Sequence, residues 1–383
     1  KPHSRDPRQL QATGESGAAQ LAIDPLASSA HTLFIPLVTR THYAQPHCSP
    51  DSPFSLQIAA LHQVEPGEGL ARHADSTAEA EWLARYDEAF PTLVEAARGS
   101  GACWARIRVN WSWIQPQPPP AAYVWGPYHD EKLGLVAESG VSLIAHIDEV
   151  PSWAGDSPYG PIDPEYLDEF AGFLFDLVSR YKNPPYDIHH WELFNEPDRT
   201  VPYGGQDGWG RNGDLYAQML SVAYHAIKAA DPEATVLMGG LAHDWFTDYG
   251  GPFSRYFPDD VMAHGGGAYI DALNVHYFRG FHSEWDRWVP PANPPTCGDV
   301  EDGLGEPYSV WGVDLIAKVS HLANRMDTCQ DVDLPMWVTE IGDHGYPGDP
   351  DSLSQQARYV VQAYVRGMAA GVENITWYAL TTP

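Results

Sequence analysis

Short apolar runs that alternate with amphipathic stretches constrain the fold of this chain more than any other feature of its sequence. Eight such runs follow one another, and each is closed by polar or turn residues, as expected of β-strands. They are Phe54–Ala60, Trp104–Trp111, Val141–Asp148, Ile188–Glu196, Thr235–Leu241, Ile270–Phe278, Met336–Ile341 and Asn374–Leu380. Stretches with helical periodicity lie between them, over residues 78–98, 129–139, 163–181, 213–230, 308–327 and 352–370.

This alternation predicts an α/β fold, a (β/α)8 TIM barrel over residues 51–383. A doubly wound sheet is the alternative, but no Gly-rich phosphate loop follows the first run. Residues 1–50 are polar and rich in Ala, Ser and Gln, which predicts an N-terminal extension or linker. The sequence ends at Pro383, directly after the eighth run, so either the chain was trimmed or the extension covers that side of the barrel.

The charge of the chain excludes several kinds of partner. Lys and Arg number 22 against 51 Asp and Glu, which gives a net charge of −29. A balance this acidic disfavours nucleic acid and anionic membrane surfaces, both of which need a basic face. No apolar run approaches the ~18–20 residues of a membrane span. The 14 Trp and 20 Tyr suit either carbohydrate rings or a Trp-rich core.

Four cysteines occur without zinc-type spacing: Cys48, Cys103, Cys297 and Cys329. Two disulfides and four free thiols are both compatible with this number. Cys48 and Cys103 each precede a neighbouring strand, and Cys297 with Cys329 would tie down the loop before the seventh run. The first residue is Lys1, so the chain is expected to be processed or trimmed. These features together favour a secreted or extracellular protein, including one at the cell surface.

A pair of glutamates marks the ends of two predicted strands. Glu196 ends the fourth run and Glu340 lies near the end of the seventh. Barrel enzymes carry their chemistry at the carboxyl ends of the strands, and two facing carboxylates are the equipment of glycoside hydrolysis. Like charges close together separate the two pKa values, so that one group donates a proton and the other attacks. A single strand-end Glu has a structural alternative, a surface ion pair.

The motifs Asn195-Glu196-Pro197 and Thr339-Glu340 resemble those of a large clan of retaining glycoside hydrolases. This clan includes cellulases, mannanases, β-xylosidases, α-L-iduronidases and arabinofuranosidases, and the segment Trp191–Pro197 is most similar to families 39 and 5. The resemblance implies that Glu196 is the acid/base, that Glu340 is the nucleophile and that Asn195 binds the sugar 2-hydroxyl. It implies no cofactor and no metal.

Strand two places Arg106 and Arg108 on one face by its period of two. The resemblance implies that Arg106 holds the nucleophile ionised. Glu192 shares a face with Glu196 on strand four, with Phe194 between them, and lies one layer deeper. We therefore expect Glu192 to pair with Arg106 or Arg108, in a contact that is as compatible with a structural role as with a functional one.

Further residues are predicted to bind the substrate. The full predicted set is Asn195, Arg106, His276, Tyr277, Trp377, Trp153, Trp111 and His146. His276 matches a clan position that lines the subsite, and Trp377 matches the aromatic floor under the reactive sugar. The clan often has Tyr two residues after the His, where this chain has Phe278, so a contact from the adjacent Tyr277 requires a bulge. For each of these His and Trp residues, core packing is the structural alternative.

The sequence thus predicts a secreted retaining glycoside hydrolase that cleaves an oligo- or polysaccharide by double displacement, with its carboxyl groups ~5–5.5 Å apart. One alternative is a catalytically silent carbohydrate-binding or structural surface protein on the same scaffold. Another is a transglycosidase, which differs only in water access. The sugar, the linkage, endo or exo action and the oligomeric state stay open.

Overall fold

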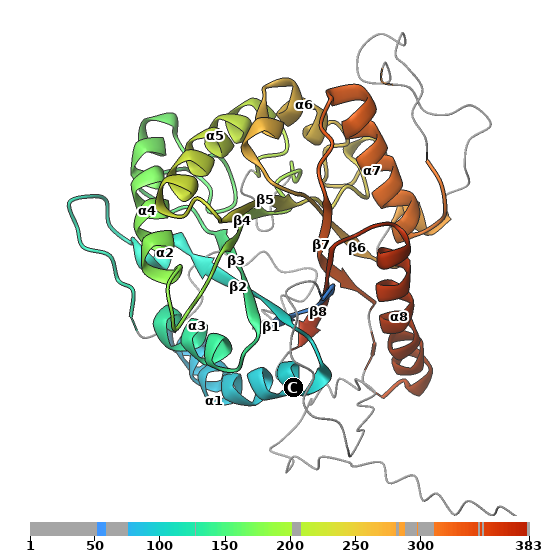
Figure 1. The fold of residues 1–383 in the computed structure, drawn as a ribbon, viewed down its shortest axis with the longest axis horizontal. Coiled ribbons are helices and arrows are strands. Elements are labelled where there is room, and N and C mark those ends of the chain that lie inside the picture. Colours follow the sequence, from blue (N-terminus) through green and yellow to red (C-terminus); the bar gives the residue numbers. More distant parts are fainter. Residues whose placement is uncertain are drawn as a thin grey trace, which may run out of the picture.

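Eight parallel strands surround a common axis in the computed structural model of the protein (Figure 1). The structure describes residues 52–58, 76–126, 128–200, 208–280, 283–287, 297, 310–343, 345–346 and 348–380. The strands are β1 Phe54–Ile58, β2 Trp104–Asn110, β3 Ser142–Asp148, β4 His190–Asn195, β5 Thr235–Gly240, β6 Leu273–Phe278, β7 Met336–Gly342 and β8 Asn374–Leu380. Each lies within or beside a predicted run, so the predicted barrel is confirmed.

The strands follow the order β5-β4-β3-β2-β1-β8-β7-β6, so β1 pairs with both β2 and β8. The remaining seam joins β5 to β6 through isolated bridges, Leu237 to Ala272 and Leu241 to Val275. The sheet is therefore a nearly closed barrel whose weakest lateral join lies between β5 and β6.

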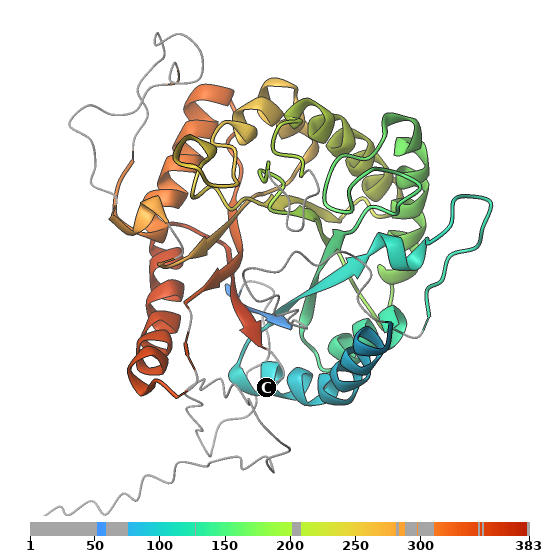
Figure 2. The ribbon, with the colours of Figure 1, turned by 180° about the vertical axis from the view of Figure 1, so that it is seen from behind.

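Helices cover the outside of the barrel, and the opposite view shows the same arrangement (Figure 2). They are α1 Ser76–Ser100, α2 Trp111–Ile114, α3 Tyr128–Glu138, α4 Leu167–Tyr181, α5 Gly213–Ala230, α6 Phe257–Ala263, α7 Leu315–Gln330 and α8 Pro350–Ala369. Single 3-10 turns occur at Pro164–Tyr166, Thr247–Tyr249, Gly266–Tyr269 and Glu284–Arg287. Helix α5 illustrates the packing, because its buried Tyr216, Leu220, Ala223 and Ile227 recur every three or four residues on one face.

Local signals explain where two helices begin. Helix α8 starts at Pro350, and the preceding Asp349 carboxylate accepts hydrogen bonds from the Asp351 and Ser352 amides. Helix α7 begins at Leu315, whereas the sequence predicted a start at residue 308. Gly312 and Asp314 have φ angles of 80° and 62°, and this left-handed backbone cannot continue a helix.

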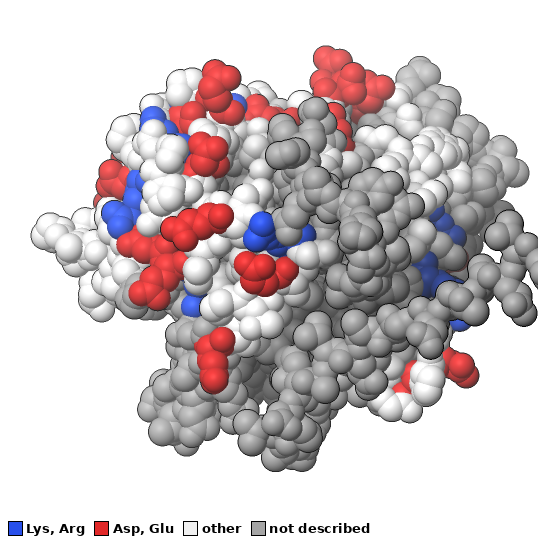
Figure 3. Space-filling model, turned by 60° about the horizontal axis from the view of Figure 1, so that its bottom comes forward, with Lys and Arg blue, Asp and Glu red and all other residues white. Residues whose placement is uncertain are grey.

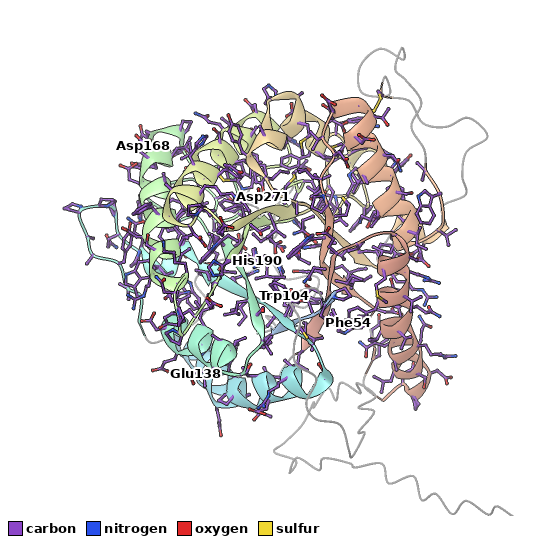
Figure 4. The ribbon with its side chains drawn as sticks, in the orientation of Figure 1. Phe54, Trp104, Glu138, Asp168, His190 and Asp271 are labelled. Carbon is purple, nitrogen blue, oxygen red and sulfur yellow. A yellow bond between two sulfur atoms is a disulfide. The ribbon has the colours of Figure 1, made fainter. Side chains whose placement is uncertain are left out.

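The amino end of the barrel is filled by aromatic rings. Three rings meet there, and their centroids lie 4.7–6.1 Å apart. They belong to the first or second residue of β2, β4 and β7, which are Trp104, His190 and Trp337. Figure 4 shows Trp104 and His190 in the middle of the barrel. Ile144 and Leu237 are buried in the same cluster. This apolar floor supports a polar layer above it.

A disulfide joins Cys297 to Cys329, as predicted. Cys103 is a buried thiol whose predicted partner is not described, so this pairing stays a prediction. Cys48 itself and the predicted extension over residues 1–50 lie outside the described residues.

Within the described ranges, no helix is long and apolar enough to cross a membrane. Acidic side chains are spread over the described part of the face in Figure 3, in keeping with the net charge of −29.

Candidate active site

The two predicted catalytic glutamates lie at the same end of the barrel. Glu196 directly follows β4, and Glu340 lies in β7 beside His276 of β6. The register of β7 shifts against both neighbours, between Val275 and His276 on one side and between Val338 and Ile341 on the other. This bulge lets two consecutive residues, Thr339 and Glu340, both point inward.

Arg106 is the centre of the polar layer and is fully buried. Its Nη1 lies 2.5 Å from Glu340 Oε1 and also donates to Gln57. Its Nε and Nη2 bind both oxygens of Glu192, at 2.6 and 2.8 Å. Burial alone would lower the pKa of Arg106, but Glu192 and Glu340 raise it above its ordinary value. The predicted pairing of Glu192 with Arg106 is confirmed, and the nucleophile candidate has an arginine countercharge.

Glu192 is the structural partner in this layer. Its Oε1 accepts further hydrogen bonds from the Gly240 amide at 3.2 Å and from the Thr339 hydroxyl at 3.0 Å. Asn274 in turn donates to Thr339 Oγ1 at 2.8 Å. Because the carboxylate is enclosed by donors and a bidentate arginine, its burial is compensated. Glu192 orients Arg106 beneath Glu340.

The end of β4 departs from the alternation of a regular strand. Phe194 and Glu196 have φ angles of 67° and 42°, in the left-handed region that non-Gly residues seldom adopt. Phe194 therefore packs outward against Phe170 and Trp209, and the prediction that it lies between the two inward glutamates is wrong. Asn195 turns inward instead, where its Oδ1 accepts from Arg106 Nη2 at 3.0 Å. Backbone strain at this corner thus brings Asn195 into the site.

Glu196 contacts a nitrogen-bearing side chain at each of its two carboxylate oxygens. Arg199 Nη2 lies 2.5 Å from its Oε2, and His276 Nδ1 lies 3.4 Å from its Oε1. Burial would raise the pKa of Glu196, but Arg199 and then His276 lower it to about 2. In the unliganded protein this carboxyl group is therefore ionised.

His276 lies between the two glutamates. Its Nδ1 is 3.7 Å from Glu340 Oε2 as well as 3.4 Å from Glu196 Oε1, and its Nε2 is 3.2 Å from Thr339 Oγ1. The ring packs against Gly240, where a Cβ atom would come within 2.1 Å of Nε2. His276 therefore joins the predicted site, in a slot that only glycine leaves open.

Three predicted site aromatics lie away from the glutamates. Tyr277 points out of the barrel and its hydroxyl contacts Asp286 and Asp314, which corrects the expectation that it binds substrate. Trp377 also faces outward and packs near Tyr359 of α8. Trp111 is buried against Phe170 and Phe173 at the start of α2, where the inward alternation of β2 has ended. Trp377 and Trp111 take the core role that was their structural alternative, and Tyr277 lies on the face expected of a regular strand.

Trp153 is half-buried and donates from its indole to the Gln115 carbonyl, so packing accounts for its position. It also makes an edge contact with Trp111. Its role in substrate binding stays a prediction.

Tyr378 is a site residue that the sequence reasoning missed. It follows Asn374 and Thr376 in the inward alternation of β8, and it meets Phe278 edge-on at 5.6 Å. Burial and then the charge of Glu340 raise its pKa. Counting by twos from Thr376, whose hydroxyl contacts Ser55 inside the barrel, would have selected Tyr378 over Trp377. The inward aromatic of β8 is therefore a tyrosine.

His146 does point into the barrel. It is buried, and neither of its ring nitrogens has a hydrogen-bond partner in the described part of the chain. Burial and then the charges of Arg106 and Arg108 lower its pKa well below the ordinary value, so the ring is neutral. Asp148 lies beyond it on β3, and burial raises the pKa of this carboxyl to about 6. The Asp148 carboxylate lies 3.6 Å from Arg108 and 3.8 Å from His146 Nε2, beyond hydrogen-bond distance of the ring.

Among the described residues, no group of three or more His, Cys, Asp or Glu side chains could hold a metal ion. The arrangement instead offers two carboxylates, a shared histidine and a buried arginine at the open end of the barrel. Such a set can donate a proton, attack an electrophilic carbon and stabilise charge.

No family model and no curated protein matches the sequence. Solved structures do match the fold. A family 39 glycoside hydrolase from Bacteroides cellulosilyticus WH2 aligns with a TM-score of 0.55 and 18% identity, over 85% of this chain and 56% of that chain. A GH39 β-xylosidase from Caulobacter crescentus aligns with a TM-score of 0.52 and 15% identity, over 89% of this chain and 66% of its own. This chain therefore spans less than two thirds of each of these proteins.

The AHE enzyme from Alicyclobacillus herbarius aligns with a TM-score of 0.52 and 15% identity, over 77% of this chain and 76% of that chain. At such identities the likeness concerns the fold alone, and the positions of catalytic residues are not carried over by it. The predicted resemblance is confirmed at that level: the chain has the (β/α)8 fold found in family 39 glycoside hydrolases.

Proposed function

We propose that this protein is a retaining glycoside hydrolase that acts outside the cytoplasm on the O-glycosidic bonds of an oligo- or polysaccharide. The observation that carries the proposal is the contact of one histidine with both glutamates, since His276 Nδ1 lies 3.4 Å from Glu196 and 3.7 Å from Glu340. The two carboxyl groups are therefore close together at the carboxyl ends of the strands, where barrel enzymes carry their chemistry.

The shared contact limits the separation of the glutamates. Glu196 Oε1 lies 3.4 Å and Glu340 Oε2 lies 3.7 Å from the same nitrogen, His276 Nδ1. The distance between these two oxygens therefore cannot exceed the sum of the two contacts. Retaining enzymes need ~5–5.5 Å and inverting enzymes ~6.5–9.5 Å to admit a water molecule. This limit on the two nearest oxygens admits the retaining separation and in this way supports the retaining mechanism. The predicted separation of ~5–5.5 Å stays a prediction.

In the first step, a Glu340 oxygen forms a bond to the anomeric carbon while the glycosidic carbon–oxygen bond breaks. The electron pair of that bond stays on the leaving oxygen, which takes a proton from Glu196. The product is a glycosyl ester of Glu340 and a free alcohol. Arg106, at 2.5 Å from Glu340, orients the attacking carboxylate and balances its charge.

In the second step, a water oxygen attacks the anomeric carbon and gives its proton to Glu196. The ester electrons return to Glu340, so both glutamates regain their starting states. In this mechanism Asn195 binds the sugar 2-hydroxyl beside the nucleophile, and its contact with Arg106 supports this role. Tyr378 offers an aromatic wall and a hydroxyl at the same end.

The extracellular location is supported by the Cys297–Cys329 disulfide. Disulfides form and persist in oxidising compartments and are rare in the cytosol. The test is to isolate the protein from its natural host, alkylate it under non-reducing conditions and measure its mass. Modification of Cys297 and Cys329 without prior reduction would argue for a reducing compartment.

The function itself is tested by a screen of nitrophenyl glycosides and polysaccharides, followed by NMR of the first anomer released. Release of the anomer with the configuration of the substrate supports double displacement, and release of the opposite anomer contradicts it. Glu340→Ala should abolish turnover without unfolding the protein. Glu165→Ala, at an exposed glutamate, is the matched control and should leave the rate unchanged.

The silent carbohydrate-binding protein remains the competing hypothesis. It predicts binding of a polysaccharide with no product from any glycoside, and the same affinity for Glu340→Ala as for the unaltered chain. A transglycosidase predicts retained configuration but transfer of the sugar to an added alcohol in preference to water. The same assays therefore separate all three.

A further inference from the structure

The acid/base candidate Glu196 is engaged at both of its oxygens in a way that favours a carboxylate. Arg199 Nη2 lies 2.5 Å from Oε2 and His276 Nδ1 lies 3.4 Å from Oε1. A general acid must carry a proton on one of these oxygens when the glycosidic bond breaks. Protonation would place a neutral carboxyl group against an arginine that cannot lose its own charge. The first step therefore needs a protonated Glu196, whereas the contacts in the free enzyme favour its carboxylate form.

Arg199 is held in this position by its surroundings. Its guanidinium lies 4.6 Å from the centre of the Phe253 ring, and its backbone forms a bridge to the same residue. Its carbonyl accepts a hydrogen bond from the Gly210 amide at 2.8 Å. Gly208 and Gly210 pass so close that a Cβ atom on either would come within 2.4 Å of a backbone oxygen of Asp198 or Arg199. The ion pair is therefore built into the loop after β4.

Other titratable groups interact with Glu196. Asp198 of the same loop and Tyr378 of β8 interact with it electrostatically. His276 of β6 links it to Glu340 of β7, which in turn pairs with Arg106 of β2. Arg106 is committed to Glu192 and Glu340, and Arg108 to Asp148 at 3.6 Å. Arg199 forms the direct ion pair with Glu196.

We propose that Arg199 is a positioning residue that keeps Glu196 ionised in the free enzyme, which confines glycosidic cleavage to acidic solution and favours hydrolysis of the glycosyl ester. This inference rests on the proposed glycosidase function. The two steps need opposite forms of Glu196, a proton donor first and a proton acceptor second. Arg199 opposes the first form and supports the second.

The first test is the pH dependence of kcat/KM, which reports the free enzyme up to formation of the glycosyl ester. The unaltered enzyme should lose kcat/KM about tenfold per pH unit from an acidic midpoint, below about pH 4, because Glu196 loses its proton there. Arg199→Met should move this midpoint upward by about 1–3 pH units, the usual effect of a neighbouring arginine. Arg199→Lys keeps the charge and should stay within about one unit of the unaltered enzyme.

The second test examines the later step. Because Arg199 supports Glu196 as a base, Arg199→Met should accumulate the glycosyl ester of Glu340 during turnover of an aryl glycoside with a good leaving group. Mass spectrometry of the quenched enzyme measures this species. An unchanged midpoint together with no accumulation in Arg199→Met would overturn the proposal, and so would a neutral midpoint in the unaltered enzyme.

A third measurement needs no activity and no variant of Arg199. The protein is labelled with side-chain ¹³C-carboxyl glutamate, and the Glu196 resonance is assigned by its loss in Glu196→Gln. Its midpoint in the unaltered protein should lie well below the ordinary value of about 4.3. An ordinary midpoint would refute the role of Arg199. If no glycoside is ever cleaved, the proposed function fails while this titration still decides the state of Glu196.

Discussion

Gly240 of β5 and His276 of β6 are packed so closely that a Cβ atom at residue 240 would come within 2.1 Å of His276 Nε2. The histidine touches both glutamates, so its slot helps to set the geometry of the site. Gly240→Ala must push the ring away. A displacement on the order of 1 Å costs up to about 10²-fold in rate, which we expect for kcat/KM on an aryl glycoside.

Gly172→Ala is the control for this substitution. Gly172 lies in α4, and a Cβ atom there would meet nothing within 4 Å. We expect unchanged kinetics and a gain in stability of about 0.5–1 kcal/mol, since alanine favours the helix. Equal kinetics for Gly240→Ala and Gly172→Ala would show that the slot does not position His276.

Arg106→Met should destabilise the fold by about 3–5 kcal/mol, because it leaves Glu192 buried without its countercharge. Urea unfolding at neutral pH measures the change. The double variant Arg106→Met, Glu192→Leu should recover part of the loss, since it removes both buried charges. A single variant within about 1 kcal/mol of the unaltered protein would contradict the central position of Arg106.

Two tyrosines on the strands that flank β7, Tyr378 of β8 and Tyr277 of β6, provide a matched pair. Tyr378→Phe should lower kcat/KM roughly tenfold, about the effect of one lost hydrogen bond, while stability stays nearly constant. Tyr277→Phe should do the reverse. Its hydroxyl contacts Asp286 and Asp314 outside the barrel, so its loss should cost about 1–3 kcal/mol of stability without a kinetic effect. Kinetic loss in Tyr277→Phe would return this residue to the site.

Asp148 should make stability depend on pH. Burial raises the pKa of its carboxyl to about 6, above the value of about 3.9 in an unfolded chain. The folded state therefore binds the proton more tightly, and this contribution is full below about pH 4 and is lost as the pH rises through about 6. The loss amounts to about 3 kcal/mol, measured by urea unfolding across this range.

Asp148→Asn should remove that part of the pH dependence, because the amide does not titrate. Asp163→Asn is the control, since Asp163 is exposed at the start of the 3-10 turn before α4. If Asp148→Asn and Asp163→Asn give curves of the same shape as the unaltered protein, Asp148 is not the titrating group.

The strands and the two glutamates could be predicted because the alternation of apolar and polar residues identifies a strand, and the polar residues that close each run identify its end. The partnership of Arg106 with Glu192 followed from the same period of two. Departures from that period could not be predicted. The left-handed backbone at Phe194 and the bulge in β7 each reverse the face on which the following residues lie. Neither position holds a glycine, so the sequence gives no sign of the irregular backbone there.

The aromatics illustrate a different limit. Trp377 and Tyr378 are neighbours on β8. The resemblance favoured the tryptophan, but Thr376 points inward and its alternation makes Tyr378 the next inward residue. Trp111 ends a predicted strand but begins a helix in the structure, and this transition turns its ring into the core. Packing of the helices decided these positions, and a single sequence carries no direct record of it.

The rings of Trp104, His190 and Trp337 close the amino end of the barrel beneath the polar layer. Among the described residues, these rings block passage from the glutamates to the amino end of the barrel. A sugar chain bound at the glutamates therefore cannot thread through the barrel, and product leaves by the end at which substrate arrives. Product that leaves slowly would therefore hold back the next substrate.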